Sequence, residues 1–380
     1  MTVVGGGPAG TYSARLLASS GRDVTVLEEH LSAGQPSHCA GVVTSEVLQS
    51  FGVRPKFLGS ISAADVILPD GTVIETSKKM PYAFIIDRCD FDKKLAEMAE
   101  DAGVTIKYGA HCKRYEVGTD GVTVETNLGQ FRSDILIGAD GQNSVLAASL
   151  GNNLIKSYVR GIQVDLKYRS DDPEKMLLRL GNEVAPGFFS WQLPLGDITR
   201  IGIGVGAQYG PPKPYLDRLL DSLGLADKER IATYSGKIPM GSRRTTFSDR
   251  LLLIGDAAGQ VKPVSGGGLY PISKAAPRLK ETVDRAYSMG MFSSSVLSLY
   301  ERGWKRDLGK SLSHGMKLRE YYDRLDDEQL CEFGHLFSRP DLAAILSDID
   351  MDNPGNVLRP MFRKKGVKSL VFKTYLRSRA

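Results

Sequence analysis

The glycine-rich start of the chain constrains the fold more than any other feature. An apolar run at residues 2–4 leads into Gly5-Gly6-Gly7-Pro8-Ala9-Gly10, which has the spacing G-x-G-x-x-G. In this spacing Gly5 permits a tight turn, Gly7 lets a diphosphate approach the backbone, and Gly10 lets a helix pack closely on the strand. Residues 8–20 have helical character, and residues 24–27 form a second apolar run. The sequence therefore predicts a β-α-β unit with parallel strands and a right-handed crossover.

An acidic residue strengthens the case for a dinucleotide at this unit. Glu28 ends the second predicted strand, where its carboxylate can accept hydrogen bonds from ribose hydroxyls. The N-terminus of the predicted helix offers free N–H groups and a partial positive charge to a diphosphate. A glycine turn without a ligand is the alternative for the glycine motif taken alone, and Glu28 favours the binding site.

Two further glycine clusters occur late in the chain. The apolar run 251–254 ends in Gly255-Asp256, and Ser265-Gly266-Gly267-Gly268 follows before a predicted helix. The Asp256 carboxylate can accept from ribityl hydroxyls, and the N–H groups of the second cluster can face the edge of a flavin ring. An ordinary Gly-Asp turn is the alternative, which is less favoured because both clusters occur in one chain.

Two weaker signals lie between these motifs. Gly138-Ala139-Asp140-Gly141 follows an apolar strand, although Asp-Gly is also a common turn. Arg88 precedes a predicted helix at residues 90–101 and can pair either with a phosphate or with a nearby carboxylate.

Together these elements resemble the flavoproteins with two dinucleotide-binding domains that share the aromatic-hydroxylase (glutathione-reductase-like) fold. The resemblance covers roughly residues 1–290 and implies FAD as the cofactor. No second G-x-G-x-x-G indicates a separate nicotinamide domain, so the electron donor, NADPH or ferredoxin, stays open. The FAD-binding residues that the resemblance implies are Gly5, Gly7, Ala9, Gly10, Glu28, Glu29, Cys39, Ala40, Arg88, the Ala110 backbone, Asp256, Gly267, Gly268 and Leu269.

The middle of the chain narrows the resemblance to one family within that fold. Phe189-Ser190-Trp191-Gln192-Leu193-Pro194, followed by Gly202-Ile203-Gly204, is similar to the Y-x-W-x-F-P and G-x-G signature of geranylgeranyl reductases. The segments 36–41 and 263–268 resemble the Cys-Gly and P-x-T-G-G-G segments of the same family. The resemblance implies that Phe189, Trp191 and Leu193 line an apolar substrate cavity over the flavin. An ordinary strand pair with a core tryptophan is the alternative.

The expected fold class is α/β with mixed α+β character. We expect a Rossmann-like FAD-binding domain, discontinuous over residues 1–60, 87–150 and 241–290, and an antiparallel-sheet substrate domain over 61–86 and 151–240. A helical C-terminal region is expected over 291–380.

The resemblance implies an FAD-dependent reductase that saturates C=C bonds of a polyprenyl chain, probably in isoprenoid phospholipid biosynthesis. An isolated alkene is a poor hydride acceptor, so it needs reduced flavin and also an acid. Cys39 is the tentative catalytic acid, with a bound water and reduced flavin as alternatives, and His38 is kept because it adjoins Cys39. The alternative function is an aromatic monooxygenase or a halogenase, although halogenases carry W-x-W-x-I-P where this chain has Phe189 and Leu193. A lipid carrier without turnover is a third hypothesis.

Composition bounds the partners and the compartment. Hydrophobic residues make up 42% and charged residues 24% of the chain, which is typical of a globular protein. No run approaches the roughly 18 apolar residues of a membrane span, and no secretory signal is recognised. The four cysteines lack metal-ligand spacing, so we expect no metal site and a reducing, cytoplasmic location. No nucleic-acid partner is expected, and the oligomeric state is open.

The last twenty residues are strongly basic. Residues 361–380 hold seven lysines and arginines and no acid, interleaved with apolar residues. Peripheral docking on an anionic membrane and a solvated basic helix end are both compatible with this pattern.

Overall fold

The predicted β-α-β unit opens a six-stranded sheet. The computed structural model describes residues 1–36, 38–151, 154–155, 157–347, 350–352, 360–361 and 363–369. The strand order is β18-β19-β12-β1-β2-β8, and all neighbours are parallel except β18 and β19. The strands are β1 (Thr2–Val4), β2 (Thr25–Glu28), β8 (Thr105–Tyr108), β12 (Leu136–Gly138), β18 (Phe247–Ser248) and β19 (Leu251–Leu253). Strands from both ends of the first 253 residues therefore share one sheet, as the sequence predicted.

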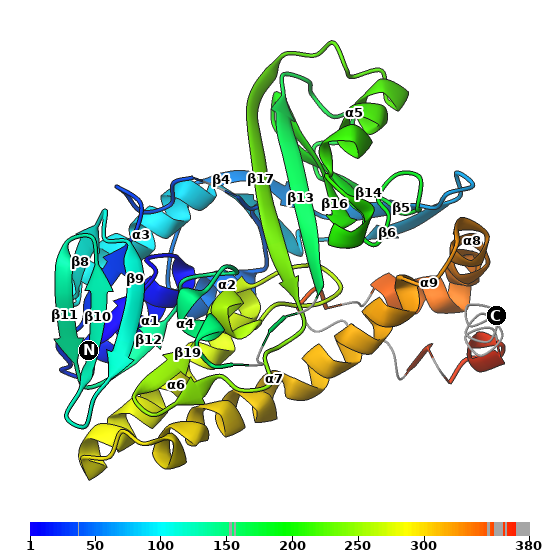
Figure 1. Ribbon diagram of the computed structural model, residues 1–380. Coiled ribbons are helices and arrows are strands. Elements are labelled where there is room, and N and C mark those ends of the chain that lie inside the picture. The colour runs from blue at the N-terminus through cyan, green and yellow to red at the C-terminus, as the bar shows by residue number, and fades with distance from the viewer. Residues whose placement is uncertain are drawn as a thin grey trace.

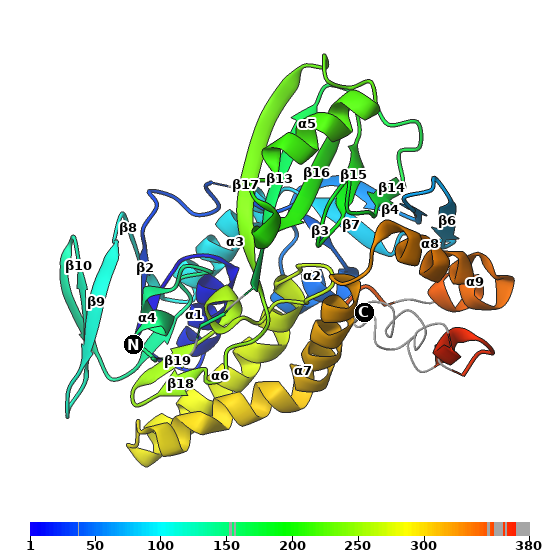
Figure 2. The same cartoon turned by 45° about the vertical axis from the view of Figure 1, so that its right-hand side comes forward.

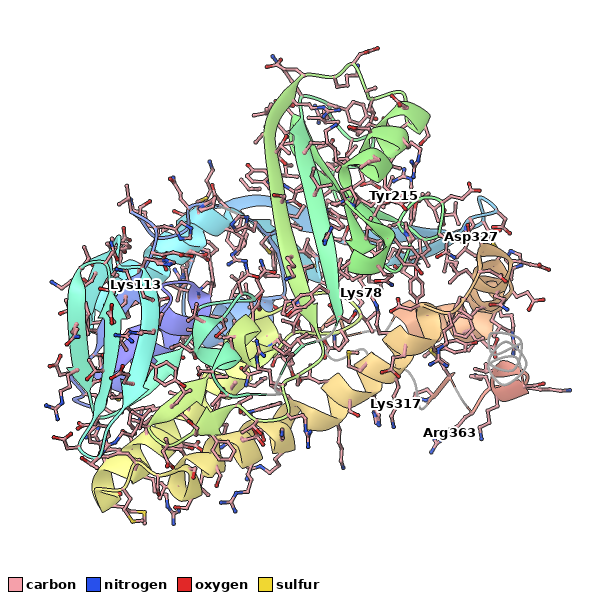
Figure 3. All side chains as sticks on the ribbon, in the orientation of Figure 1. Lys78, Lys113, Tyr215, Lys317, Asp327 and Arg363 are labelled. Carbon is pink, nitrogen blue, oxygen red and sulfur yellow. The ribbon has the colours of Figure 1, made fainter. Side chains whose placement is uncertain are left out.

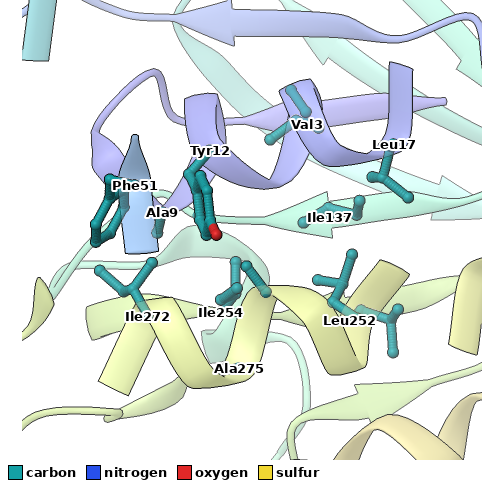
Figure 4. Packing of buried hydrophobic residues seen from close by; sticks show 14 of the residues in the cluster. Val3, Ala9, Tyr12, Leu17, Phe51, Ile137, Leu252, Ile254, Ile272 and Ala275 are labelled. Carbon is teal, nitrogen blue, oxygen red and sulfur yellow. The ribbon is translucent and has the colours of Figure 1, made fainter. Parts of the chain in front are cut away.

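Helices cover this sheet because its strands are apolar on both faces. They are α1 (Pro8–Ala18), α3 (Arg88–Asp101) and α6 (Leu269–Met289), with the shorter α2 (Ser45–Phe51) and α4 (Val145–Ala148) beside them. Figure 4 shows the main core, where Tyr12 and Leu17 of α1 meet Ile272 and Ala275 of α6. This packing holds the two glycine-rich regions of the sequence against each other.

A three-stranded antiparallel meander joins β8 to β12. Its strands are β9 (Cys112–Val117), β10 (Val122–Thr126) and β11 (Gly129–Ser133). Val122 and Val124 are fully buried against Leu136 of the six-stranded sheet. The meander thus packs on the dinucleotide-binding sheet and lies beside β8 in Figure 1.

A seven-stranded sheet stands on the first one in both views (Figures 1 and 2). Its order is β17-β13-β16-β15-β14-β5-β6, and it is antiparallel except for the parallel pair β14 and β5. The strands are β5 (Ala63–Ile67), β6 (Val73–Ser77), β13 (Ser157–Leu166), β14 (Lys175–Arg179), β15 (Ser190–Leu195), β16 (Ile198–Gly206) and β17 (Arg230–Met240). Helix α5 (Lys213–Ser222) buries Leu216 and Leu220 against one face.

A third, small sheet lies between the two. Its order is β3-β7-β4, with β3 (Val42–Val43), β4 (Phe57–Ile61) and β7 (Ala83–Ile86). Ile61 and Ile85 share an apolar cluster with Leu193 of β15. The domain boundaries stay a prediction, and the one drawn at residue 60 falls inside β4.

Helices dominate after residue 268, as the sequence predicted. Helix α7 (Ser294–Tyr322) runs beneath the six-stranded sheet towards α8 (Asp327–His335) and α9 (Pro340–Ser347) (Figure 2). Asp327, labelled in Figure 3, accepts a hydrogen bond from the Asn182 N–H at 2.6 Å and so joins α8 to the end of the seven-stranded sheet. Short 3₁₀ turns occur at Ala207–Tyr209, Gly255–Ala258 and Leu336–Ser338. Within the described part of the chain, no helix has the length and apolarity to cross a membrane.

Candidate functional site

The first glycine loop combines two tightly packed glycines with one that faces open space. A Cβ on Gly5 would lie 2.2 Å from the Ala139 carbonyl oxygen, and a Cβ on Gly10 would lie 1.9 Å from the Gly5 carbonyl oxygen. Gly5 also has a φ of 101°, which favours glycine. A Cβ on Gly7 would meet no atom within 4 Å. The space at Gly7, beside the N-terminus of α1, fits the approach of a diphosphate.

Glu28 holds this loop in place. Its side chain is buried, and Oε2 accepts from the Gly6 N–H at 2.5 Å while Oε1 accepts from the His30 N–H at 2.8 Å. The carboxylate therefore orders the backbone around the space where a ribose would bind. This second role was not apparent in the sequence, because it depends on how β2 lies against the loop.

Two predicted neighbours of Glu28 lie differently. The Ala110 N–H donates to the Glu28 carbonyl oxygen at 2.8 Å, and Ala110 is fully buried. Glu29 has a side chain that is 57% exposed and pairs with His111 Nδ1 at 3.1 Å. The structure thus keeps Ala110 at the loop and turns Glu29 outward.

The late glycine clusters meet the first loop. A Cβ on Gly255 would lie 2.7 Å from the Ala9 Cβ, and the Asp256 Oδ1 lies 3.3 Å from the Cβ position of Gly268. Gly268 is the N-cap of α6, whose first residue is Leu269. The N-termini of α1 and α6 and the Asp256 carboxylate therefore belong to one site.

Asp256 is a carboxylate without a partner within the described chain. Burial raises its pKa from 3.8 to about 6, and only the charge of Arg88 opposes that rise. No hydrogen bond among the described residues reaches its oxygens. An acceptor of this kind fits the hydroxyls of a ribityl chain, which would supply the missing donors.

Arg88 pairs with a carboxylate, one of the two alternatives that the sequence left open. It is the first residue of α3 and not the residue before the helix, because Asp87 is the N-cap. Its Nη2 lies 3.0 Å from Asp92 Oδ1, and its Nε donates to the same oxygen at 3.1 Å. Arg88 also interacts with Cys39. Arg88 therefore lies between the Cys39 segment and Asp256.

The Cys39 segment is tied to the seven-stranded sheet by its backbone. The Cys39 carbonyl oxygen accepts from Gln163 Nε2 at 3.0 Å, and the Ala40 carbonyl oxygen accepts from Arg200 Nη1 at 2.9 Å. Arg200 is held in turn by two hydrogen bonds to Asp165, at 2.7 and 2.8 Å. All three polar side chains are buried. The sequence analysis missed them, although polar residues alternating within an apolar strand are a recognisable signal.

The histidine beside Cys39 does not join the site. His38 is exposed, and its Nδ1 lies 2.6 Å from the Ser235 carbonyl oxygen of β17. The Cys39 thiol is half-buried and accepts from the Gly41 N–H at 3.4 Å.

The aromatic motif forms a continuous surface on β15. Phe189 stacks on Phe188, with ring centroids 4.1 Å apart, and meets Trp191 edge-on at 6.2 Å. Leu193 is buried in the next position on the same face. The paired glycines of β16 make room for these rings: a Cβ on Gly202 would lie 2.3 Å from Trp191 Cε2.

This aromatic surface lies against the glycine turn before α6. A Cβ on Gly266 would lie 2.9 Å from Ile238 Cδ1 and 3.5 Å from Phe188 Cζ. Gly267 belongs to the same turn, which Lys262 closes by donating its N–H to the Gly267 carbonyl oxygen at 3.0 Å. The structure thus brings the Trp191 motif and the flavin-type loops together, while the role of each residue towards FAD stays a prediction.

Comparisons with known proteins agree with this geometry. A family model described as an FAD binding domain matches residues 1–176. Digeranylgeranylglycerophospholipid reductase 2 of Methanothermobacter thermautotrophicus is 31% identical over 369 residues, which covers 91% of this chain and 93% of the relative. Digeranylgeranylglycerophospholipid reductase of Methanocaldococcus jannaschii is 28% identical over 351 residues, covering 87% and 88%.

Solved structures share the fold. A geranylgeranyl bacteriochlorophyll reductase-like protein of Thermoplasma acidophilum superposes with a TM-score of 0.86 at 21% identity, covering 97% of this chain and 98% of the other. The halogenase PltM in complex with FAD gives a TM-score of 0.69 at 16% identity, covering 98% and 85%. The predicted fold class and the FAD cofactor are confirmed. The chain is an FAD-dependent oxidoreductase and belongs to the digeranylgeranylglycerophospholipid reductase family.

Proposed function

We propose that this flavoprotein saturates C=C bonds of geranylgeranyl chains carried by an isoprenoid lipid. The observation that carries the proposal is the contact of Phe188 and Ile238 with the glycine turn at Gly266. Through this contact the aromatic surface of β15 borders the place where the residues fit the flavin ring. An alkene chain held on that surface would lie beside the ring.

FAD supplies a hydride when it is bound and reduced, and the chain's own residues supply position and dryness. Phe189, Trp191 and Leu193 present apolar side chains that exclude water and hold a prenyl chain without directional bonds. Fixing the alkene in one orientation removes much of the entropic barrier to reaction. The relatives named as digeranylgeranylglycerophospholipid reductases support this substrate class.

Cys39 is our candidate for the proton that completes the reduction. Its half-buried thiol lies on a segment held by Gln163 and Arg200, and it interacts with Arg88 near Asp256. Thiol and alkene would therefore sit on the same side of the site. A Cys39→Ser variant that reduces the lipid at the full rate would assign the proton to a bound water or to reduced flavin.

The deciding experiment uses anaerobic holoenzyme reduced with dithionite. Digeranylgeranylglyceryl phosphate should reoxidise the flavin, and mass spectrometry of the extracted lipid should show two mass units gained for each saturated double bond. Tight lipid binding without reoxidation would indicate a lipid carrier. Turnover that requires oxygen would indicate the monooxygenase or halogenase alternative.

We propose in addition that the basic C-terminal residues bring the enzyme to anionic membranes, where such a lipid resides. Residues 362 and 370–380 of this stretch lie outside the described residues. Among the described ones, Arg363, Lys365 and Lys368 are exposed. A lipid substrate supports this interpretation over a solvated helix end.

A further inference from the structure

A short piece of the C-terminal region packs into the cluster that contains the tryptophan motif. Met351 is half-buried there and lies 160 residues beyond Trp191 in the chain. The buried members of the cluster are Ile61, Ala64, Ala83, Ile85, Met176 and Leu193, and its partly buried members include Ala40, Val42 and Trp191. A side chain from the far end of the chain thus occupies part of the surface assigned above to the prenyl chain.

Polar contacts fasten this piece from two directions. Asp352 is buried, and its Oδ1 accepts from Lys262 Nζ at 2.7 Å while its Oδ2 accepts from Thr44 Oγ1 at 2.5 Å. Lys262 Nζ also donates to the Met351 carbonyl oxygen at 2.9 Å. Removing one member of a buried ion pair leaves the other charge uncompensated, so this attachment is costly to break.

The attachment leads directly to the flavin-type turn. The backbone of Lys262 closes that turn through hydrogen bonds with Gly266 and Gly267, at 2.8 and 3.0 Å. Thr44 precedes α2 and caps it by accepting from the Val47 N–H. Met351 is therefore fixed relative to both the turn and the Trp191 surface, which is the arrangement of a wall and not of a removable plug.

We propose that Met351 is a substrate-contacting residue that limits the space beside Trp191 and so determines how far a prenyl chain enters. Asp352, Lys262 and Thr44 are positioning residues that act through it. Methionine suits this place because its unbranched, polarizable side chain conforms to an irregular apolar chain. The inference rests on the proposed function.

The test compares two chain lengths on anaerobic, dithionite-reduced holoenzyme: geranylgeranyl diphosphate with 20 carbons and farnesyl diphosphate with 15. Met351→Trp should lower the rate ratio of the longer to the shorter substrate by about tenfold, since one methylene of pocket space commonly changes specificity by that much. Met351→Ala should raise the ratio and change which double bonds are saturated. Calorimetric titration of the oxidised enzyme with both diphosphates should show the same order of affinities.

The matched control is Met361→Ala. Met361 is also a buried methionine of the C-terminal region, but it packs in a separate cluster with Leu342 and Val367. This variant should keep the wild-type ratio and product pattern. Asp352→Asn should reproduce the product pattern of Met351→Ala with FAD retained, and Thr44→Val replaces it as the test if Asp352→Asn fails to fold.

The outcomes separate the two proposals. Wild-type enzyme that reduces neither diphosphate nor the glycerophospholipid overturns the proposed function and this inference with it. Wild-type enzyme that reduces both diphosphates, with Met351 variants that keep its ratio and product pattern, overturns the inference alone.

Discussion

The indole Nε1–H of Trp191 donates to Oε1 of Gln163 at 3.1 Å, and this contact links the substrate surface to the Cys39 segment. Gln163 passes the link on, because its Nε2 donates to the Cys39 carbonyl oxygen at 3.0 Å. Gln163 is buried, so the amide has no water to replace either partner. The tryptophan of the family motif therefore positions a neighbouring segment as well as bordering the cavity.

Replacement of Trp191 should separate these two roles. Trp191→Phe keeps an aromatic side chain but removes the donor to Gln163, so we expect a moderate loss of rate. Trp191→Ala also enlarges the cavity, and reoxidation of reduced flavin by substrate should slow further, with a changed pattern of saturated double bonds. FAD content, measured by absorbance, should stay at the wild-type level in both. A Trp191→Ala protein that simply unfolds would support the interpretation of Trp191 as an ordinary core residue.

Gly7→Ala should reduce FAD binding without affecting the fold. A Cβ at this position meets no protein atom within 4 Å, so its methyl group would lie in the space for the diphosphate. Flavin content after purification should fall, while the thermal unfolding of the flavin-free protein should not change. Gly309→Ala in α7, whose Cβ makes only an ordinary contact with Lys305, is the control and should retain FAD. Full flavin content in Gly7→Ala would refute the diphosphate assignment.

Glu28→Ala should weaken FAD binding by about 1–3 kcal/mol, the cost of losing hydrogen bonds to a charged acceptor. Two contributions add here, because Glu28 also orders the loop through the Gly6 N–H. Glu29→Ala is the matched control, since Glu29 is exposed and paired with His111. Fluorescence titration of flavin-free protein with FAD measures both affinities. Equal losses in the two variants would contradict the assignment to Glu28.

Asp256→Asn should stabilise the flavin-free protein at high pH and weaken FAD binding. Burial raises the pKa of Asp256 to about 6, so the stabilising protonated form is complete below about pH 4 and is lost as the pH rises through about 6. The charged carboxylate then costs on the order of 3 kcal/mol. Thermal unfolding at pH 8 should show a higher Tm for the variant, and at pH 4 the difference should vanish.

The control for this pH dependence has the opposite sign. The Thr72 N–H lowers the pKa of Asp70 to about 2, so its charged form is favoured in the folded protein. Asp70→Asn should therefore give no gain in Tm at pH 8. A gain in both variants would attribute the effect to net charge.

Neutralising the C-terminal bases should weaken binding to anionic vesicles. Met361 and Val367 pack with Leu342, so substitution is cleaner than truncation. Replacing Arg363, Lys365 and Lys368 by glutamine should cost about 1 kcal/mol for each base in low salt, and the difference should shrink as salt is raised.

The charge-matched control replaces Lys93, Lys107 and Lys113 by glutamine. Lys113 lies far from Arg363 in Figure 3. Cosedimentation with phosphatidylserine vesicles compares the two triple variants. Equal losses would indicate a diffuse charge effect in place of a docking stretch.

Local geometry explains what the sequence determined by itself. The G-x-G-x-x-G loop, the Asp70-Gly71 hairpin between β5 and β6, and α3 each follow from backbone preferences within a few residues. The apolar strands around residues 137 and 252 were likewise sufficient to predict one discontinuous sheet. FAD and the family followed from the same short motifs.

Only the tertiary structure decided how distant side chains pair. Gln163 reaches Cys39 across 124 positions of the chain, and Lys262 reaches Asp352 across 90. Such pairs depend on how the seven-stranded sheet lies against the glycine turn, a packing arrangement that no local pattern encodes. The outward turn of Glu29, the partner of Arg88 and the place of Met351 were decided in the same way. Local motifs thus determined the cofactor and the chemistry, and long-range packing determined the shape of the site around them.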